Sequence, residues 1–138
     1  MQRVYSLLVD NNSGVLSRIS GLFTRRGYNI DSITAGVTAD PRFTRITIVS
    51  SGDEIILSQI EKQIAKLEDV IVVKVLKSEE SVYRELILVK IRANAQQRSE
   101  IVSIADIFRA KIVDAERESL VIELTGTQSK LEAFLQLL

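Results

Sequence analysis

Residues 8–33, LVDNNSGVLSRISGLFTRRGYNIDSI, decide the fold of the N-terminal half, because three structural patterns follow one another within them. The apolar stretch Val4–Val9 predicts a strand that ends at this segment. Gly27 comes directly after two arginines and ends a predicted helix, and β-branched residues over Ile30–Thr38 then predict a second strand. The apolar residues with helical spacing between the two strands are Val15, Leu16, Ile19, Leu22 and Phe23.

The pattern continues outward from this strand–helix–strand unit. Ala39–Arg42, which holds the single proline, predicts a turn, and the alternation in Thr44–Ser50 predicts a third strand. A second helix follows Asp53, and Val70–Leu76 predicts a fourth strand. The order β-α-β-β-α-β is that of an α+β ferredoxin-like sandwich, with an antiparallel sheet and both helices on one face.

The second half repeats this order after a polar linker at residues 77–84. Strands are predicted at Glu85–Arg92, Lys111–Glu116 and Leu120–Thr125, with a helix after the first and another after the last. A weak internal repeat pairs Gly52 with Gly126, and the apolar residues of the two following helices also correspond. We therefore expect two tandem ferredoxin-like domains, 1–76 and 85–138. The second lacks a last strand, so we expect either a longer natural chain or a partner segment over the gap.

Composition excludes several classes of function. The sequence contains neither cysteine nor histidine, which removes thiolate and imidazole metal sites and nucleophile–histidine pairs. The 18 basic and 18 acidic residues balance, and aromatic residues make up only 5%, so nothing favours binding to nucleic acid. No apolar run has the length of a membrane span, and we expect a cytoplasmic protein with no catalytic or metal-binding residues.

The loop at residues 10–14, DNNSG, has two interpretations. Asn12 or Ser13 can simply cap the following helix, since such caps and turns are common. The alternative is a binding site, because the first turn of this helix contains no acidic residue and leaves its N–H groups open to an anion. Gly14 permits close approach to the backbone, and the amides of Asn11 and Asn12 suit a zwitterion such as a small amino acid.

Two other segments provide comparisons. The corresponding loop of the second half, ANAQQRSE at residues 93–100, has no glycine, and we expect Glu100 to occupy the first turn of its helix. Binding is therefore expected in the first domain only. Asn29, in the helix-to-strand turn, either tolerates an unusual backbone angle or belongs to a site that a second copy of the domain completes. Asp10 and Asp31 are a candidate carboxylate pair, although their spacing does not require one.

Residues 8–33 closely resemble the start of the small, regulatory subunit of acetohydroxyacid synthase, also called acetolactate synthase. The resemblance continues through GDEIILSQIEKQIAKLEDV, RELILVKIRA, IFRAKIVD and LTGTQSKLEAFL, and so covers nearly the whole chain. It implies an N-terminal ACT domain, a dimer in which two ACT sheets join side by side, and a branched-chain amino acid, typically valine, bound at the interface between them.

The resemblance also implies which residues bind the effector and which partner the chain has. One chain contributes the loop and the other its helix-to-strand turn, and Ser17 supports the loop. The implied partner is a separate catalytic large subunit, which carries thiamine diphosphate, Mg and FAD, while this subunit has no cofactor. The implied effector-binding positions are Asn11, Asn12, Ser13, Gly14, Val15 and Leu16, with Asn29 and Ile30 across the interface.

Three other functions compete with this one. An ACT-type amino-acid sensor of a different enzyme is the main alternative, and the resemblance along nearly the whole chain argues against it. A ferredoxin-like nucleic-acid binder would need aromatic residues on the sheet and a basic surface. The third is a small enzyme that uses only carboxylates, and turnover by the isolated chain would reveal it.

Overall fold

The computed structural model describes all 138 residues and divides the chain into two compact units, Met1–Ser81 and Val82–Leu138. The division falls between the two predicted domains, where Ser78–Glu80 form a short 3-10 helix. The first unit consists of β1 (Gln2–Asp10), α1 (Val15–Arg26), β2 (Asn29–Val37), β3 (Phe43–Ser51), α2 (Glu54–Ala65) and β4 (Val70–Leu76). The second consists of β5 (Glu85–Arg92), α3 (Ala95–Ile107), β6 (Lys111–Ala115), β7 (Ser119–Gly126) and α4 (Gln128–Leu137).

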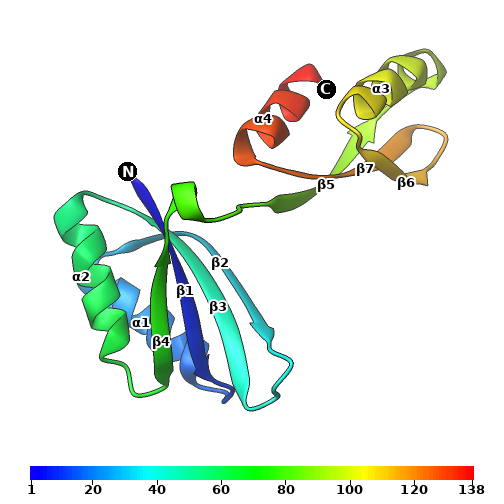
Figure 1. The fold of residues 1–138 in the computed structure, drawn as a ribbon. Coiled ribbons are helices and arrows are strands. Elements are labelled where there is room, and N and C mark those ends of the chain that lie inside the picture. The colour runs from blue at the N-terminus through cyan, green and yellow to red at the C-terminus, as the bar shows by residue number, and fades with distance from the viewer. The chain divides into compact units, whose positions relative to one another are not determined.

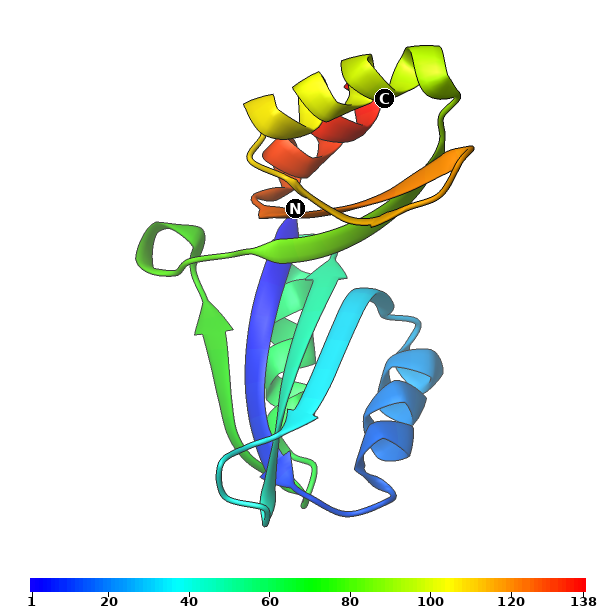
Figure 2. The same ribbon diagram turned by 90° about the vertical axis from the view of Figure 1, so that its right-hand side faces the viewer.

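The first unit has the predicted βαββαβ order. Its four strands lie in the order β2-β3-β1-β4, and all neighbours are antiparallel. Both helices cover one face of this sheet (Figures 1 and 2). Because β1 and β3 are central, β2 is left as an edge strand, and eight of its nine residues are exposed.

The core of the first unit lies between the sheet and the two helices. Tyr5 is fully buried, and its hydroxyl donates to the Leu57 carbonyl oxygen over 2.6 Å, which ties β1 to α2. Burial raises the pKa of Tyr5 to about 12, because the charged form is poorly solvated there. The other buried residues of this core are Leu7, Val9, Val15, Ile19, Leu22, Phe23, Ile46, Ile48, Leu57, Ile60 and Ile64.

The predicted end of the first helix is confirmed. Gly27 adopts a left-handed conformation (φ 68°), and its N–H donates to the Thr24 carbonyl, a common way for a helix to terminate. Arg25 and Arg26 occupy the last turn, where positive charge complements the helix dipole. The chain then enters β2 directly.

The second unit is a three-stranded antiparallel sheet in the order β5-β7-β6, with α3 and α4 side by side on one face (Figure 2). β5, β6 and β7 correspond to β1, β2 and β3. In the first unit β4 pairs with β1, whereas in the second unit β5 forms the edge. The internal repeat corresponds in space as well, because Leu57 and Leu131 are buried in equivalent helices. No helix in either unit has the length and apolarity needed to cross a membrane.

Candidate functional site

The loop between β1 and α1 leaves the start of the helix without a side-chain cap. Gly14 is the N-cap residue, and no side chain accepts a hydrogen bond from the first turn. The prediction that Asn12 or Ser13 caps the helix is therefore wrong. The first turn contains no acidic residue, as the sequence indicates. The Val15 N–H donates to the Asn12 backbone carbonyl over 3.4 Å. The positive end of the helix dipole and the N–H groups of Leu16 and Ser17 thus stay available to an external anion.

The other three α-helices are all capped by their own side chains. Asp53 caps α2 by accepting from the Ile56 N–H over 2.8 Å, and Glu54 follows in the first turn. Asn94 caps α3 in a capping box with Gln97, with bonds of 2.9 and 3.1 Å, while Thr127 caps α4. The expectation that Glu100 lies in the first turn of α3 is wrong, because that helix begins at Ala95. The start of α3 is nevertheless capped by the chain's own side chains, so it differs from the open start of α1, as expected for the second unit.

Asn11 ties the loop to the turn between β2 and β3. Its backbone N–H donates to the Arg42 carbonyl and its side-chain Nδ2 donates to the Pro41 carbonyl, both over 2.9 Å. Its Oδ1 accepts from the Thr44 hydroxyl over 3.1 Å. These bonds occupy part of the hydrogen-bonding capacity of the Asn11 side chain, which was expected to be available to a ligand. Asn11 keeps one N–H and one acceptor position.

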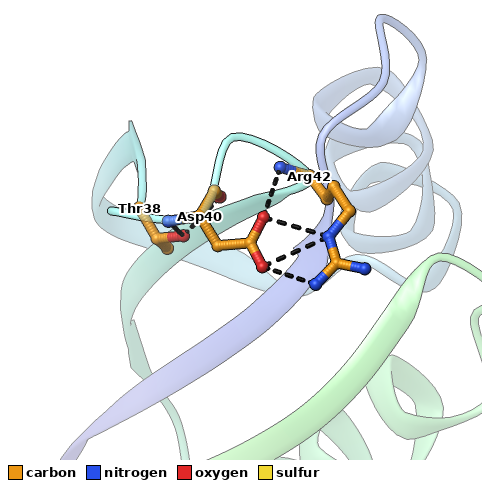
Figure 3. Close-up of polar contacts among 3 residues, drawn as sticks. All are labelled: Thr38, Asp40 and Arg42. Carbon is orange, nitrogen blue, oxygen red and sulfur yellow. Dashed lines mark hydrogen bonds and ion pairs between the residues drawn. The ribbon is translucent and has the colours of Figure 1, made fainter.

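The turn that receives Asn11 contains hydrogen bonds of its own (Figure 3). The Thr38 hydroxyl donates to the Asp40 carbonyl over 2.7 Å and accepts from the Asp40 N–H over 3.2 Å. The Arg42 guanidinium donates to both carboxylate oxygens of Asp40 through three hydrogen bonds, the shortest being 2.7 Å. These bonds lower the pKa of Asp40. The two carbonyls that accept from Asn11 therefore belong to a turn with its own hydrogen bonds.

A second set of contacts holds the loop from the other side, and its two charged residues were missed by the sequence analysis. Arg18 forms an ion pair through Nε with Asp69, which lies in the α2–β4 connection. Asn12 joins the pair by accepting from Arg18 over 3.1 Å and donating to Asp69 over 3.3 Å. The hydrogen bond from Arg18 lowers the pKa of Asp69. The spacing of Arg18 from Gly14, one helical turn, is visible in the sequence and places the arginine over the helix start. Asp69 lies 51 residues after Arg18, and only the fold brings the two together.

Gly14 lies directly beneath this arginine. A Cβ atom built on Gly14 would come within 2.5 Å of the Arg18 Nη1 atom. The atom that would have to move is the far end of a flexible side chain, so a small residue would displace the guanidinium rather than the backbone. Glycine thus allows the Asn12–Arg18–Asp69 contacts to form next to the helix start.

A pocket with a volume of about 190 Å³ opens beside the loop. Its apolar wall comes from the helix and from the inner face of the sheet, and its polar rim comes from the loop. It is lined by Val9, Asp10, Asn11, Asn12, Ser13, Val15, Leu16, Thr44 and Ile46. Five predicted site residues, Asn11 to Ser13 with Val15 and Leu16, therefore come together here. Leu16 is 48% exposed, so the pocket borders on open surface.

The remaining predicted positions lie elsewhere in the same chain. Asn29 and Ile30 begin β2 and pair with Ser51 and Ser50, at the opposite end of β3 from Thr44. Asn29 is an ordinary strand residue, because the left-handed conformation belongs to Gly27, and the turn interpretation of Asn29 is wrong. Ser17 lies on the exposed face of α1, where its carbonyl accepts from the Ser20 hydroxyl.

The candidate carboxylate pair does not form within the chain. Asp10 is the last residue of β1, whereas Asp31 accepts a hydrogen bond from Gln2, the first residue of that strand. The two carboxylates therefore lie at opposite ends of the sheet. Asp10 and Asp31 therefore cannot act together as a carboxylate pair within one chain.

Comparisons with known proteins agree with this architecture. Residues 5–72 match the model of a family described as the AHAS small subunit-like ACT domain, and residues 84–138 match that of the small subunit of acetolactate synthase. The chain is 47% identical over 138 residues to the acetolactate synthase small subunit of Haemophilus influenzae, covering all of this chain and 85% of that protein.

Two further relatives extend the agreement to a second sequence and to a solved structure. The chain is 47% identical to the acetolactate synthase isozyme 3 small subunit of Escherichia coli, over 98% of this chain and 83% of that one. It matches the crystal structure of the acetolactate synthase small subunit from Thermotoga maritima with a TM-score of 0.93 and 42% identity, over 100% of this chain and 86% of that one. The chain belongs to the family of acetolactate synthase small subunits, the regulatory rather than the catalytic chains of that enzyme.

Proposed function

We propose that this chain binds valine, or another branched-chain amino acid, where two copies of its first unit meet. The chain activates a catalytic acetolactate synthase subunit, and binding of the amino acid inhibits that subunit. The observation that carries the proposal is the uncapped start of α1 beside a pocket with an apolar wall. The helix start suits a carboxylate, and Val15, Leu16 and Ile46 suit a branched aliphatic side chain.

The exposed edge of the first unit supports a two-chain site. Antiparallel pairing of two β2 strands about a two-fold axis brings the start of one strand to the end of the other. Val37 near that end pairs with Thr44, and Thr44 donates to Asn11. A partner's β2 would therefore bring its first residues, Asn29 and Ile30, toward the loop and complete the pocket.

Inhibition requires the effector to bind one state of the assembly more tightly than another. A coupling of about 1–3 kcal/mol is typical of allosteric systems, and it would shift the equilibrium between the two states of the assembly by about 5- to 150-fold. An effector that bridges two chains is suited to this, because it changes the geometry of the interface. In this proposal the subunit works in the cytoplasm without a cofactor, and thiamine diphosphate, Mg and FAD belong to the catalytic partner.

Reconstitution with a catalytic acetolactate synthase subunit tests the proposal. We expect this chain to raise the rate of acetolactate formation, and valine, leucine or isoleucine to reverse that increase. Binding of the catalytic subunit without any response to the three amino acids would contradict the effector part. A failure to bind it at all would favour the alternative, an ACT-type sensor of a different enzyme.

A further inference from the structure

Asp31 is the centre of a hydrogen-bond cluster that surrounds Asn29. It accepts from the Asn29 Nδ2 over 2.5 Å, from the Gln2 Nε2 over 3.1 Å and from the Ser51 hydroxyl. These donors come from β2 itself, from the start of β1 and from the end of β3. The position of the carboxylate is thus fixed by three strands.

A β-bulge places this carboxylate. The pairing of β2 with β3 shifts between Ile30 and Ser32, so Asp31 is the extra residue. Bulges change the direction of a side chain relative to a regular strand. The second unit has the same shift in β6, between Ile112 and Asp114, but its extra residue is Val113. The bulge therefore belongs to the shared fold, whereas the carboxylate is particular to the first unit.

The cluster orients the Asn29 amide. The Asn29 carbonyl accepts from the Ser50 hydroxyl, which holds the backbone, and Nδ2 points at Asp31. The amide oxygen Oδ1 is then turned away and accepts no hydrogen bond within the chain. A carboxylate offers only acceptors, so it can hold Nδ2 but not Oδ1, and the flipped amide is disfavoured. In the second unit Lys111 occupies the position of Asn29 and cannot present an acceptor.

We propose that Asp31 is a positioning residue that fixes Asn29 with Oδ1 directed at the effector, where it accepts a hydrogen bond from the α-ammonium group. This inference rests on the proposed function, in which Asn29 reaches the loop of a partner chain. The orientation of the effector follows: its ammonium group faces Asn29, its carboxylate faces the start of α1, and its side chain lies against the apolar wall. Such a site selects the amino acid over the 2-hydroxy or 2-oxo acid of the same carbon skeleton, because these lack the ammonium group.

Calorimetry on the full chain with two ligands tests the assignment. Valine and 2-hydroxy-3-methylbutanoate share their carboxylate and side chain and differ only at the α-substituent. For the wild type we expect a preference for valine. In Asp31→Asn the new amide can also donate, so it holds Asn29 in either orientation, and we expect valine to bind about tenfold more weakly while the hydroxy acid changes little.

A swapped pair separates positioning from a general structural role. Asn29→Asp combined with Asp31→Asn keeps one amide and one carboxylate but presents only oxygen to the effector, so the preference for valine should return. Gln2→Ala removes one donor to Asp31, so it should lower the preference for valine, as Asp31→Asn does, but by a smaller factor. This variant replaces Asp31→Asn in the test if Asp31→Asn does not fold. The control is Asp114→Asn, beside the equivalent bulge, which should change nothing.

The outcomes distinguish the two proposals. An unchanged preference in Asp31→Asn, or an equal loss for both ligands, would overturn the positioning role while the proposed function stands. No binding of any branched-chain amino acid to the wild-type chain would overturn the proposed function and this inference with it.

Discussion

The two units share one topology but differ at two places that concern binding. In the first unit α1 starts without a side-chain cap, and the bulge of β2 carries Asp31. In the second unit Asn94 and Gln97 fill the start of α3, and the bulge of β6 carries Val113. The strand order and the bulge are therefore features of the fold. Only the first unit leaves a helix start open. Only the first unit also has a carboxylate, Asp31, that holds the side chain of Asn29 at the start of its edge strand.

The comparison also shows how the open helix start is maintained. A helix that lacks a cap loses stability relative to one that has a cap, typically by about 1 kcal/mol. In the first unit, side-chain contacts hold the loop without supplying a side-chain acceptor for the N–H groups of the first turn. Asn11 connects the loop to the β2–β3 turn, and Asn12 connects it to Arg18 and Asp69. The loop is thus held by side-chain contacts, although none of these side chains accepts from the first turn of α1.

Gly14→Asp should produce the largest effect, because it makes the first unit resemble the second. The new carboxylate lies at the helix start, next to the Arg18 guanidinium, and replaces the carboxylate of the effector. We expect valine binding to weaken by about 100-fold or more, which corresponds to about 3 kcal/mol. Isothermal titration calorimetry on the full chain measures it.

Gly14→Ala is the matched control for this substitution. It introduces the same Cβ and displaces the same guanidinium but adds no charge. We expect less than about a tenfold loss of affinity, which is under about 1.4 kcal/mol. Equal losses in the two variants would mean that space, and not charge, is what Gly14 provides.

Asn94→Ala should produce an intermediate effect, confined to the second unit. Its side chain accepts from the Gln97 N–H, so its removal should cost α3 about 1 kcal/mol. Ser13→Ala, at the uncapped start of α1, should change stability by less than about 0.5 kcal/mol. Hydrogen exchange of the amides in α1 and α3 measures each helix separately. A comparable loss of protection in α1 after Ser13→Ala would show that the first helix has a cap after all.

The ion pair of Asp69 should give the smallest effect, with a defined pH dependence. Arg18 lowers the pKa of Asp69 in the folded chain, so the pair stabilises the fold above the pKa of the unfolded carboxylate, about 3.9. That stability is lost as the pH falls through the lowered value. Urea unfolding should therefore separate wild type from Asp69→Asn at neutral pH and bring them together in strong acid. Asp114→Asn in the second unit serves as the control, and a difference that persisted in strong acid would contradict the account.

The sequence predicts the architecture well because periodicity and helix stop signals are local. The alternation in β3, the apolar stripe of α1 and the stop at Gly27 all appear in the structure. The absence of an acidic residue from the first turn of α1 could also be predicted, but α3 and α4 lack one too and are closed by side-chain caps, so this absence alone does not make a helix start open. The cap at Asn12 or Ser13 was wrong because backbone geometry, and not residue type alone, decides which residue caps a helix.

The remaining part of the site depends on residues that are distant in sequence. Asp69 meets Arg18 only because α2 returns the chain beside the loop, and Asp31 gains its donors from β1 and β3. The bulge at Asp31 shifts the pairing by one residue, which no periodic pattern reveals. Charged or polar residues in such positions look like ordinary surface in the sequence.

Backbone amide NMR of the full chain during titration with valine tests most directly whether the two units differ in binding. We expect chemical shift changes at the Asn11–Leu16 loop and at Asn29–Asp31, which lie at opposite ends of one sheet, and none at Asn94–Gln97 or Lys111–Val113. Both groups in the first unit should saturate at the same valine concentration, because they form one site across two chains. Changes confined to the second unit, or to only one end of the first, would contradict the account.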